Sequence, residues 1–207
     1  MDQHDYKNMV LLDRIKCISR GDVLVDVGAC RGTYTRFFAN RLMHTGKLYC
    51  LELSPINFKR LQKDFSNHKN IEFVNAAISD LDGSLPYYEG HTSETHNILG
   101  HDTGFLKNQE AGTIQSITLD TLLKDEKYIK MIKIDVEGAE GRVLKGMKEV
   151  AKRTEYLLLE NHFDEDWEEI REILIEEYDF TCYNIETDAL IDMTSKRPYQ
   201  CLCTRKK

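Results

Sequence analysis

The sequence is short of several features that would place it in other classes of protein. It has only three prolines, and its longest wholly apolar runs fall far short of the roughly 20 residues that cross a bilayer. No secretory signal is recognisable before the first predicted helix, so we expect no membrane span. Acidic residues outnumber basic ones and give a net charge of −7, so no positive field would gather nucleic acid. We therefore expect a partner that is neither a membrane nor a nucleic acid.

The six cysteines form no C-x-x-C pair, which disfavours a zinc or dithiol motif. Most of them lie in strand-like or turn segments, where small buried thiols are common. Cys201 and Cys203 would point to the same face of one strand, which suits packing better than metal ligation. We expect reduced thiols and a cytoplasmic protein.

The order of apolar runs predicts the fold class. With 207 residues, of which 41% are hydrophobic, residues 1–207 are expected to form one domain with one full core. An amphipathic helix is predicted within residues 1–20. Alternating apolar and helical patterns then predict strands at 22–27, 47–53, 71–76, 130–135, 155–160, 180–185 and 199–204. This order is typical of an α/β fold with a doubly wound, seven-stranded, mostly parallel sheet whose last strand is antiparallel.

A glycine-bearing turn directly follows the first predicted strand. That strand carries Asp26 near its end, and Gly28 and Gly32 would let the backbone approach a ligand closely. A dinucleotide fingerprint would need glycines where the chain has Cys30 and Thr33, and no P-loop lysine is present. The turn indicates a different nucleoside cofactor, with an ordinary tight βα turn as the alternative.

Polar residues at the ends of the next two strands extend this candidate site, because ligands bind beyond the carboxyl ends of strands in such sheets. Glu52 and Leu53 close the second strand, where an acidic side chain could accept hydrogen bonds from both ribose hydroxyls. Asn75 and Ala76 close the third, where small side chains leave space for a purine. A surface carboxylate at a helix start and a common turn asparagine are the alternatives.

The block from Ile132 to Glu140, IKIDVEGAE, resembles the signature of the FkbM-type methyltransferase family. The resemblance extends to Val143-Leu144, Gly146, the run from Asp26 to Ala29, the stretch from Ala77 to Gly83 and Thr118-Leu119-Asp120. It covers roughly residues 22–162, about two thirds of the chain. The chain departs from the family at Cys30, where members usually carry Asn.

The resemblance implies a Rossmann-like class I methyltransferase fold, S-adenosylmethionine as the cofactor, and methylation of hydroxyls on sugars, glycans or other natural products. Asp26 is expected to bind the cofactor's amino group directly or through water, and backbone groups from Gly28 to Cys30 would line its amino acid portion. The expected cofactor-binding residues are Asp26, Gly28, Ala29, Cys30, Gly32, Glu52, Leu53, Asn75, Ala76 and Asp135.

Four side chains at the ends of the fourth and fifth strands are the candidates for chemistry: Asp135, Glu137, Glu160 and His162. Methyl transfer to a hydroxyl needs a base, and His162 is predicted as the base with Asp135 as its orienter and Glu137 beside them. Alternatively, Glu137 and Glu140, which flank Gly138 at a helix start, complement the helix dipole, and His162 caps a loop. A divalent cation held by Asp135, Glu160 and His162 ranks second, and no metal is predicted.

The polar segment 87–112 is predicted to be a loop over the acceptor. It carries aromatic and imidazole side chains at Tyr87, Tyr88, His91, His96, His101 and Phe105. Its aromatic rings would stack on a sugar face. The spacing of its histidines is weak evidence for zinc, and a solvated loop is favoured.

Together these features predict an S-adenosylmethionine-dependent O-methyltransferase that acts on a sugar or glycan hydroxyl. The alternatives are methylation of a phenol, lipid or polyketide-like hydroxyl, and a cofactor-binding module without turnover. An NAD-dependent oxidoreductase is disfavoured by Cys30 and Thr33. The sequence does not indicate an oligomeric state.

Overall fold

Eight strands form the main sheet of the computed structural model, which describes residues 3–89, 96–99, 109–164 and 166–205. In their order across the sheet they are β10 (Ala189–Ile191), β9 (Phe180–Asn184), β11 (Gln200–Arg205), β8 (Thr154–Glu160), β7 (Ile129–Ile134), β1 (Val23–Val27), β2 (Lys47–Leu51) and β3 (Ile71–Val74). The strands from β8 to β3 pair in parallel, whereas β11 is antiparallel to both β8 and β9. The predicted fold class, with its antiparallel last strand, is confirmed.

All seven predicted strands are present, with ends within two residues of those predicted. The count of seven was wrong by one, because β10 adds a short antiparallel strand to β9 at the sheet edge. Its three residues are too few to form a recognisable alternating pattern.

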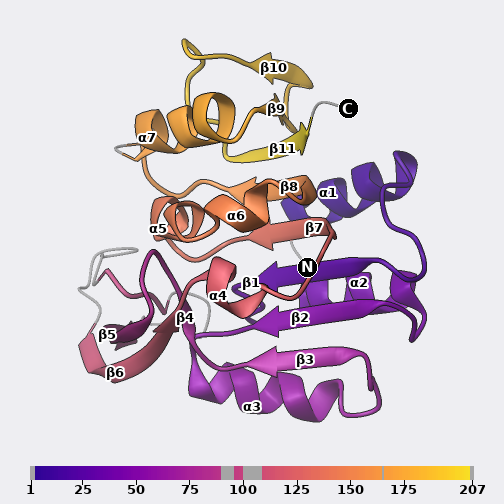
Figure 1. Cartoon of the computed structure of the whole chain (residues 1–207), viewed down its shortest axis with the longest axis vertical. Coiled ribbons are helices and arrows are strands. Elements are labelled where there is room, and N and C mark those ends of the chain that lie inside the picture. Colours follow the sequence, from indigo (N-terminus) through magenta and orange to yellow (C-terminus); the bar gives the residue numbers. More distant parts are fainter. Residues whose placement is uncertain (1–2, 90–95, 100–108, 165, 206–207) are drawn as a thin grey trace.

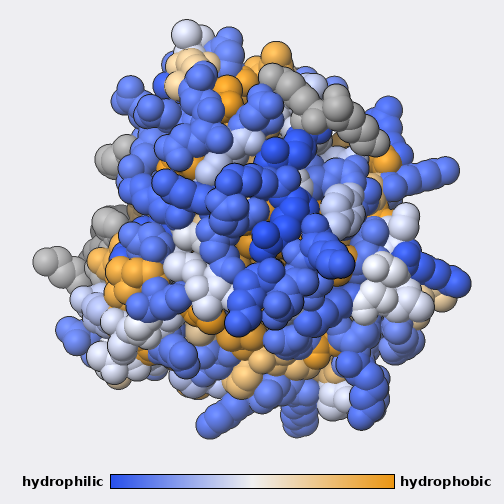
Figure 2. All heavy atoms as spheres, in the orientation of Figure 1, coloured by the Kyte–Doolittle hydropathy of each residue, from blue (hydrophilic) through white to orange (hydrophobic). Residues whose placement is uncertain are grey.

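Helices cover both faces of the sheet (Figure 1). On one face lie α1 (Gln3–Arg14), α2 (Thr33–Leu42) and α3 (Pro55–Asp64); on the other lie α4 (Leu119–Leu122), α5 (Glu140–Lys145), α6 (Lys148–Ala151), α7 (Trp167–Glu172) and the π-helical turn η1 (Ile173–Glu177). Successive strand residues point to opposite faces, so Leu24 packs in the first layer with Phe38, and Val25 packs in the second with Val143. The outer sides of the helices are polar, and Figure 2 shows polar side chains over most of the face that it presents.

The opening helix is shorter than the 1–20 expected. It ends at Arg14, and Lys16 then takes a left-handed backbone with φ 49° that turns the chain toward β1. No helix in the described ranges is long and apolar enough to cross a bilayer. One domain over residues 1–207 stays a prediction.

A second sheet of three strands lies beside the carboxyl ends of β1, β2 and β3, toward which their arrowheads point in Figure 1. Its order is β4 (Ala77–Ile78), β6 (Gln109–Ile117) and β5 (Gly83–Glu89). The predicted loop 87–112 was therefore too long, because β5 and β6 take up its two ends. Pro86 argues against a strand in the sequence, but the structure tolerates a proline at this position because β5 is an edge strand. His91, His101 and Phe105 lie outside the described residues.

Cys182 and Cys203 form a disulfide, contrary to the expectation of reduced thiols. They lie directly opposite each other on β9 and β11. Their separation of 21 residues gives no sequence motif, so only the strand register brings them together. The other four cysteines lie among the described residues and are not part of a disulfide.

Candidate active site

A cavity of about 890 Å³ lies at the carboxyl ends of β1, β2 and β7, and its size suits a ligand as large as a nucleoside derivative. It is lined by the predicted residues Gly28, Ala29, Cys30, Glu52, Leu53, Ala76, Asp135, Glu137, Glu160 and His162. Three other predicted cofactor residues, Asp26, Gly32 and Asn75, are not among its lining residues. His96, from the predicted acceptor segment, also lines it.

The turn after β1 is held against both neighbouring strands. The N–H groups of Gly28 and Ala29 donate to the Leu51 carbonyl, at 3.0 and 3.1 Å. Gly28 has φ 77°, and a Cβ there would lie 1.8 Å from the Asp135 carbonyl oxygen at the end of β7. Gly32, with φ 78°, likewise packs against side chains at α3. These glycines are thus required for packing within the protein, whereas the sequence suggested close approach to a ligand.

Glu52 is held by the backbone while it lines the cavity. Its carboxylate accepts hydrogen bonds from the N–H groups of Cys30 and Ser54, each at 2.7 Å. The side-chain amide of Asn75 donates to the backbone carbonyl of Glu52 at 2.8 Å and so fixes the backbone that follows β2. Asn75 does not line the cavity in which a purine was expected. Burial raises the pKa of Glu52 above its usual value, and the two backbone donors oppose this.

Asp26 lies behind the cavity surface and does not face it. Its side chain is fully buried and accepts a hydrogen bond from Thr35 Oγ1 at 2.6 Å. Burial raises the pKa of Asp26, and the charge of Lys133 opposes this. The expected direct contact between Asp26 and a cofactor amino group is therefore not supported by its position.

Lys133 is a buried charge of the site that the sequence reasoning missed. Its Nζ lies 2.8 Å from Asp135 Oδ2, 3.4 Å from the Gly28 carbonyl oxygen and 3.9 Å from Asp26 Oδ1. Burial lowers the pKa of Lys133, but the charges of Asp135 and Asp26 outweigh this and raise it above its usual value. The sequence did contain a signal for this residue, because Lys133 lies between Ile132 and Ile134 in a strand predicted to be buried. A buried charge needs charged partners nearby.

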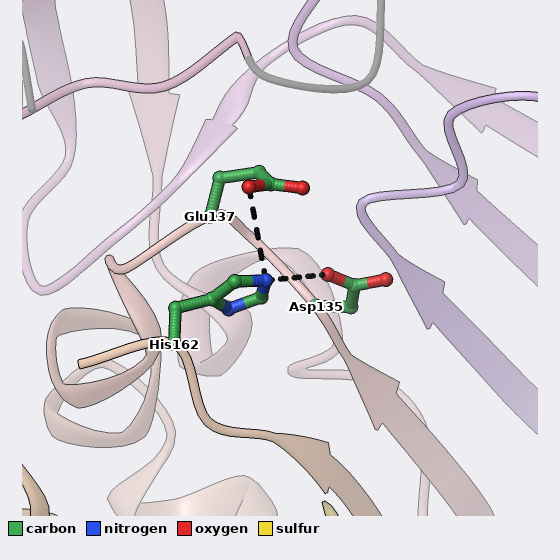
Figure 3. Close-up of side chains that lie close together, drawn as sticks. All are labelled: Asp135, Glu137 and His162. Carbon is green, nitrogen blue, oxygen red and sulfur yellow. Dashed lines mark ion pairs between the residues drawn. The ribbon is translucent and has the colours of Figure 1, made fainter. Parts of the chain in front are cut away.

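His162 stands at the centre of four carboxylates. Its Nε2 lies 3.7 Å from both Asp135 Oδ1 and Glu137 Oε2 (Figure 3). Nε2 also lies 3.6 Å from Glu160 Oε1, and Nδ1 donates to Glu140 Oε1 at 2.8 Å. Burial lowers the pKa of His162, but the hydrogen bond and charge of Glu140 lead the opposing effects and raise it to about 9. The structure thus brings together the four side chains predicted for chemistry.

The carboxylates around His162 differ in their own partners. Glu160 accepts hydrogen bonds from Tyr199 Oη at 2.5 Å and Gln200 Nε2 at 2.7 Å. Burial raises the pKa of Glu137 to about 7. The ligand atoms of Asp135, Glu137 and His162 lie within 4.8 Å of one another, so this group is able to hold a metal ion. The metal ligands suggested by the sequence were Asp135, Glu160 and His162, so the group found in the structure has Glu137 in place of Glu160.

Glu140 is the second residue whose contact the sequence reasoning missed. Besides His162, its Oε1 accepts hydrogen bonds from the N–H groups of Val136 and Gly138, at 3.2 and 3.1 Å. The sequence suggested a role at the helix dipole, and its place in the first turn of α5 agrees with that. The contact with His162 joins residues 22 positions apart, so no local pattern indicates it.

The sheet order and the cavity at its carboxyl edge define a class I, Rossmann-like methyltransferase fold, and solved structures share it. The FkbM methyltransferase of Methylobacillus flagellatus aligns with a TM-score of 0.62 at 17% identity, over 90% of this chain and 44% of that one. An S-adenosylmethionine-dependent O-methyltransferase of Thermotoga maritima aligns with a TM-score of 0.55 at 13% identity, over 96% and 64%. At these identities the likeness shows the fold alone.

Residues 26–182 match the family described as the methyltransferase FkbM domain, so the chain belongs to the FkbM methyltransferase family. This confirms the resemblance identified in the sequence. A relative is the hexuronic acid methyltransferase AglP of Haloferax volcanii, 27% identical over 158 residues, which are 75% of this chain and 62% of AglP. The chain thus spans less than two thirds of that relative and less than half of the Methylobacillus protein.

Proposed function

We propose that this chain is an S-adenosylmethionine-dependent O-methyltransferase that methylates a hydroxyl group of a sugar or glycan. The family supports the transfer of a methyl group. The observation that carries the proposal is the single cavity in which the glycine turn and Glu52 meet the cluster around His162. A cytoplasmic location is part of the same proposal.

The residues of the cavity fit S-adenosylmethionine. The Glu52 carboxylate lines the cavity at the end of β2, where the Cys30 and Ser54 N–H groups hold it in place, and a carboxylate in this position suits hydrogen bonds from ribose hydroxyls. Leu53, Ile78 and Ile98 give the lining an apolar part that suits adenine. The carboxylates of the His162 cluster complement a cation. When bound, this cofactor supplies an activated methyl group on a positively charged sulfur.

The sugar class has two supports. Tyr34, Phe163 and Tyr199 line the cavity, and aromatic rings stack well against sugar faces. The relative AglP is named as a methyltransferase of a hexuronic acid. We therefore expect the acceptor to enter beside these rings, with one hydroxyl directed at the His162 cluster.

The acceptor hydroxyl must lose its proton near His162, which we propose as the group that promotes this loss. The ring atom that faces Asp135 and Glu137 is Nε2. The carboxylate that accepts the orienting hydrogen bond from Nδ1 is Glu140, and not Asp135 as expected. A pKa of about 9 leaves His162 protonated at neutral pH. Nε2 therefore takes part in proton removal only after its own proton has been displaced.

A panel of acceptors tests the proposed reaction. The chain is incubated with S-adenosylmethionine and, separately, a uronic acid glycoside, a neutral hexose, a phenol and a fatty acyl alcohol, and products are read by mass. We expect a methylated product from one of the sugars. A product only from the phenol or the lipid would favour the second acceptor class. Two results would favour a binding module without turnover. One is cofactor binding with no methylated product, and the other is no loss of the protein's function after Asp135→Ala and His162→Ala.

A further inference from the structure

We infer that Asp135, Glu137 and His162 form a binding site for a divalent cation such as Mg²⁺ or Mn²⁺. The inference rests on the proposed function, because the open positions of the cation would take hydroxyl groups of the sugar acceptor. Carboxylate oxygens with one imidazole suit a hard or borderline divalent ion. Such an ion lowers the pKa of a bound hydroxyl and so assists the loss of its proton.

The separations of the three ligand atoms fit one ion. His162 Nε2 lies 3.7 Å from both Asp135 Oδ1 and Glu137 Oε2, and all three atoms lie within 4.8 Å of one another (Figure 3). An ion equidistant from three atoms so spaced would stand about 2.1 to 2.4 Å from each when it lies in their plane, the shortest distance possible, and this is close to metal–ligand bond lengths. Glu160 Oε1, 3.6 Å from Nε2, lies near enough to bind through water or to join as a fourth ligand.

The orientation of His162 is an independent observation that indicates a ligand. Metal-binding histidines usually donate their second ring N–H to a carboxylate, which fixes the ring and directs the other nitrogen at the ion. His162 Nδ1 makes this contact with Glu140 at 2.8 Å. The Glu140 side chain is only 2% exposed and is itself held by two backbone N–H groups, so Nε2 is fixed toward the cavity.

The charges of the site leave room for a cation. Asp135 uses Oδ2 to bind Lys133 at 2.8 Å, which leaves Oδ1 directed at His162. Glu137 stands with Asp135 and Glu160 around His162 Nε2, and an ion among these carboxylates would offset their mutual repulsion. An ion on Nε2 would occupy the lone pair of that nitrogen, so His162 would then promote loss of the acceptor proton as a ligand of the ion and not by accepting the proton itself.

Titration of Mn²⁺ into chelator-treated full-length chain tests the site, with free Mn²⁺ followed by electron paramagnetic resonance, with and without S-adenosylmethionine. We expect one ion per chain, with affinity at least tenfold weaker in both Glu137→Gln and His162→Ala. Glu140→Leu keeps all three ligands and should still weaken binding about tenfold, because the ring loses the acceptor that orients it. Glu169→Gln removes the same charge from an exposed pair with Lys145 and should leave binding unchanged.

Far-ultraviolet circular dichroism of each variant, and its affinity for S-adenosylmethionine within about threefold of the unaltered chain, separate lost ligands from lost folding. No Mn²⁺ binding at millimolar concentration would overturn the cation site and leave the methyltransferase proposal standing if S-adenosylmethionine still binds. Equal binding by all variants would mean an adventitious ion only, and would also overturn the site. Mn²⁺ binding without binding of S-adenosylmethionine would support the site and overturn the proposed function.

Discussion

The two halves of the cavity differ in how their polar groups are satisfied. In the cofactor half, formed by residues 28–30 and Glu52, the carboxylate is held by two backbone donors at 2.7 Å. In the acceptor half, formed by Asp135, Glu137, Glu160 and His162, three carboxylate oxygens stand 3.6 to 3.7 Å from Nε2, beyond hydrogen-bonding distance. The Glu52 carboxylate is therefore fixed by backbone donors, whereas none of the three carboxylate oxygens around Nε2 is hydrogen-bonded to it.

The largest expected effect separates the halves by activity. His162→Ala should lower kcat by roughly 10² to 10⁴, because it removes the group that promotes loss of the acceptor proton. Binding of S-adenosylmethionine, measured by calorimetry, should change by less than about threefold. A matched loss of cofactor affinity would contradict the division of the cavity into two halves.

Lys133 contacts both halves of the cavity, through the Gly28 carbonyl oxygen and Asp135. We expect its removal to lower mainly the free energy of unfolding. Lys133→Met leaves the fully buried Asp26 and the partly exposed Asp135 without their cation, so we expect the free energy of unfolding to fall by about 3 to 5 kcal/mol. Lys130→Met, on the same strand, removes a less buried pair with Glu155 and should cost about 1 kcal/mol. Urea denaturation compares the two, and equal losses would argue against a special role for Lys133.

The pH dependence of stability reports on the acceptor half. Because the pKa of His162 is about 9 in the folded chain and near 6.5 when unfolded, the folded state binds more protons between these values. This stabilisation is complete below pH 6.5 and is lost as pH rises toward 9, with an upper limit of about 3 kcal/mol. Thermal unfolding of metal-free protein should show the loss, and His162→Gln should remove most of it. A profile unchanged by His162→Gln would contradict the charged state of His162.

The smallest of these effects belongs to the cofactor half. Glu52→Ala should weaken S-adenosylmethionine at least tenfold, while kcat at saturating cofactor changes little, because the carboxylate binds and does not react. Calorimetry and steady-state kinetics measure the two quantities. A fall in kcat with unchanged affinity would reverse the roles assigned to the halves.

The sequence predicted the sheet well because burial of parallel strands on both faces leaves long apolar runs. The strands that carry the site, such as 130–135, were predicted within one residue of β7. The β4–β6 sheet was missed because β4 has only two residues, β5 and β6 carry many polar residues, and β5 contains Pro86. Such edge strands gain their pairing from a partner far along the chain.

The site was predicted as a set of strand ends, and its internal contacts were not. The position of a residue after a strand indicates that Asp135 and His162 converge. It does not indicate which side chain bonds to which, so Glu140 and Lys133 were missed and Asp26 was expected in the open. Those contacts join residues that are distant in sequence or that alternate along one strand.

Calorimetric titration of the chain with S-adenosylmethionine tests the central claim most directly, since every role above assumes that this cofactor occupies the cavity. The account predicts one site per chain, bound also by the demethylated product S-adenosylhomocysteine and competed by it. Absence of binding heat with both ligands, for protein shown to be folded, would contradict the account.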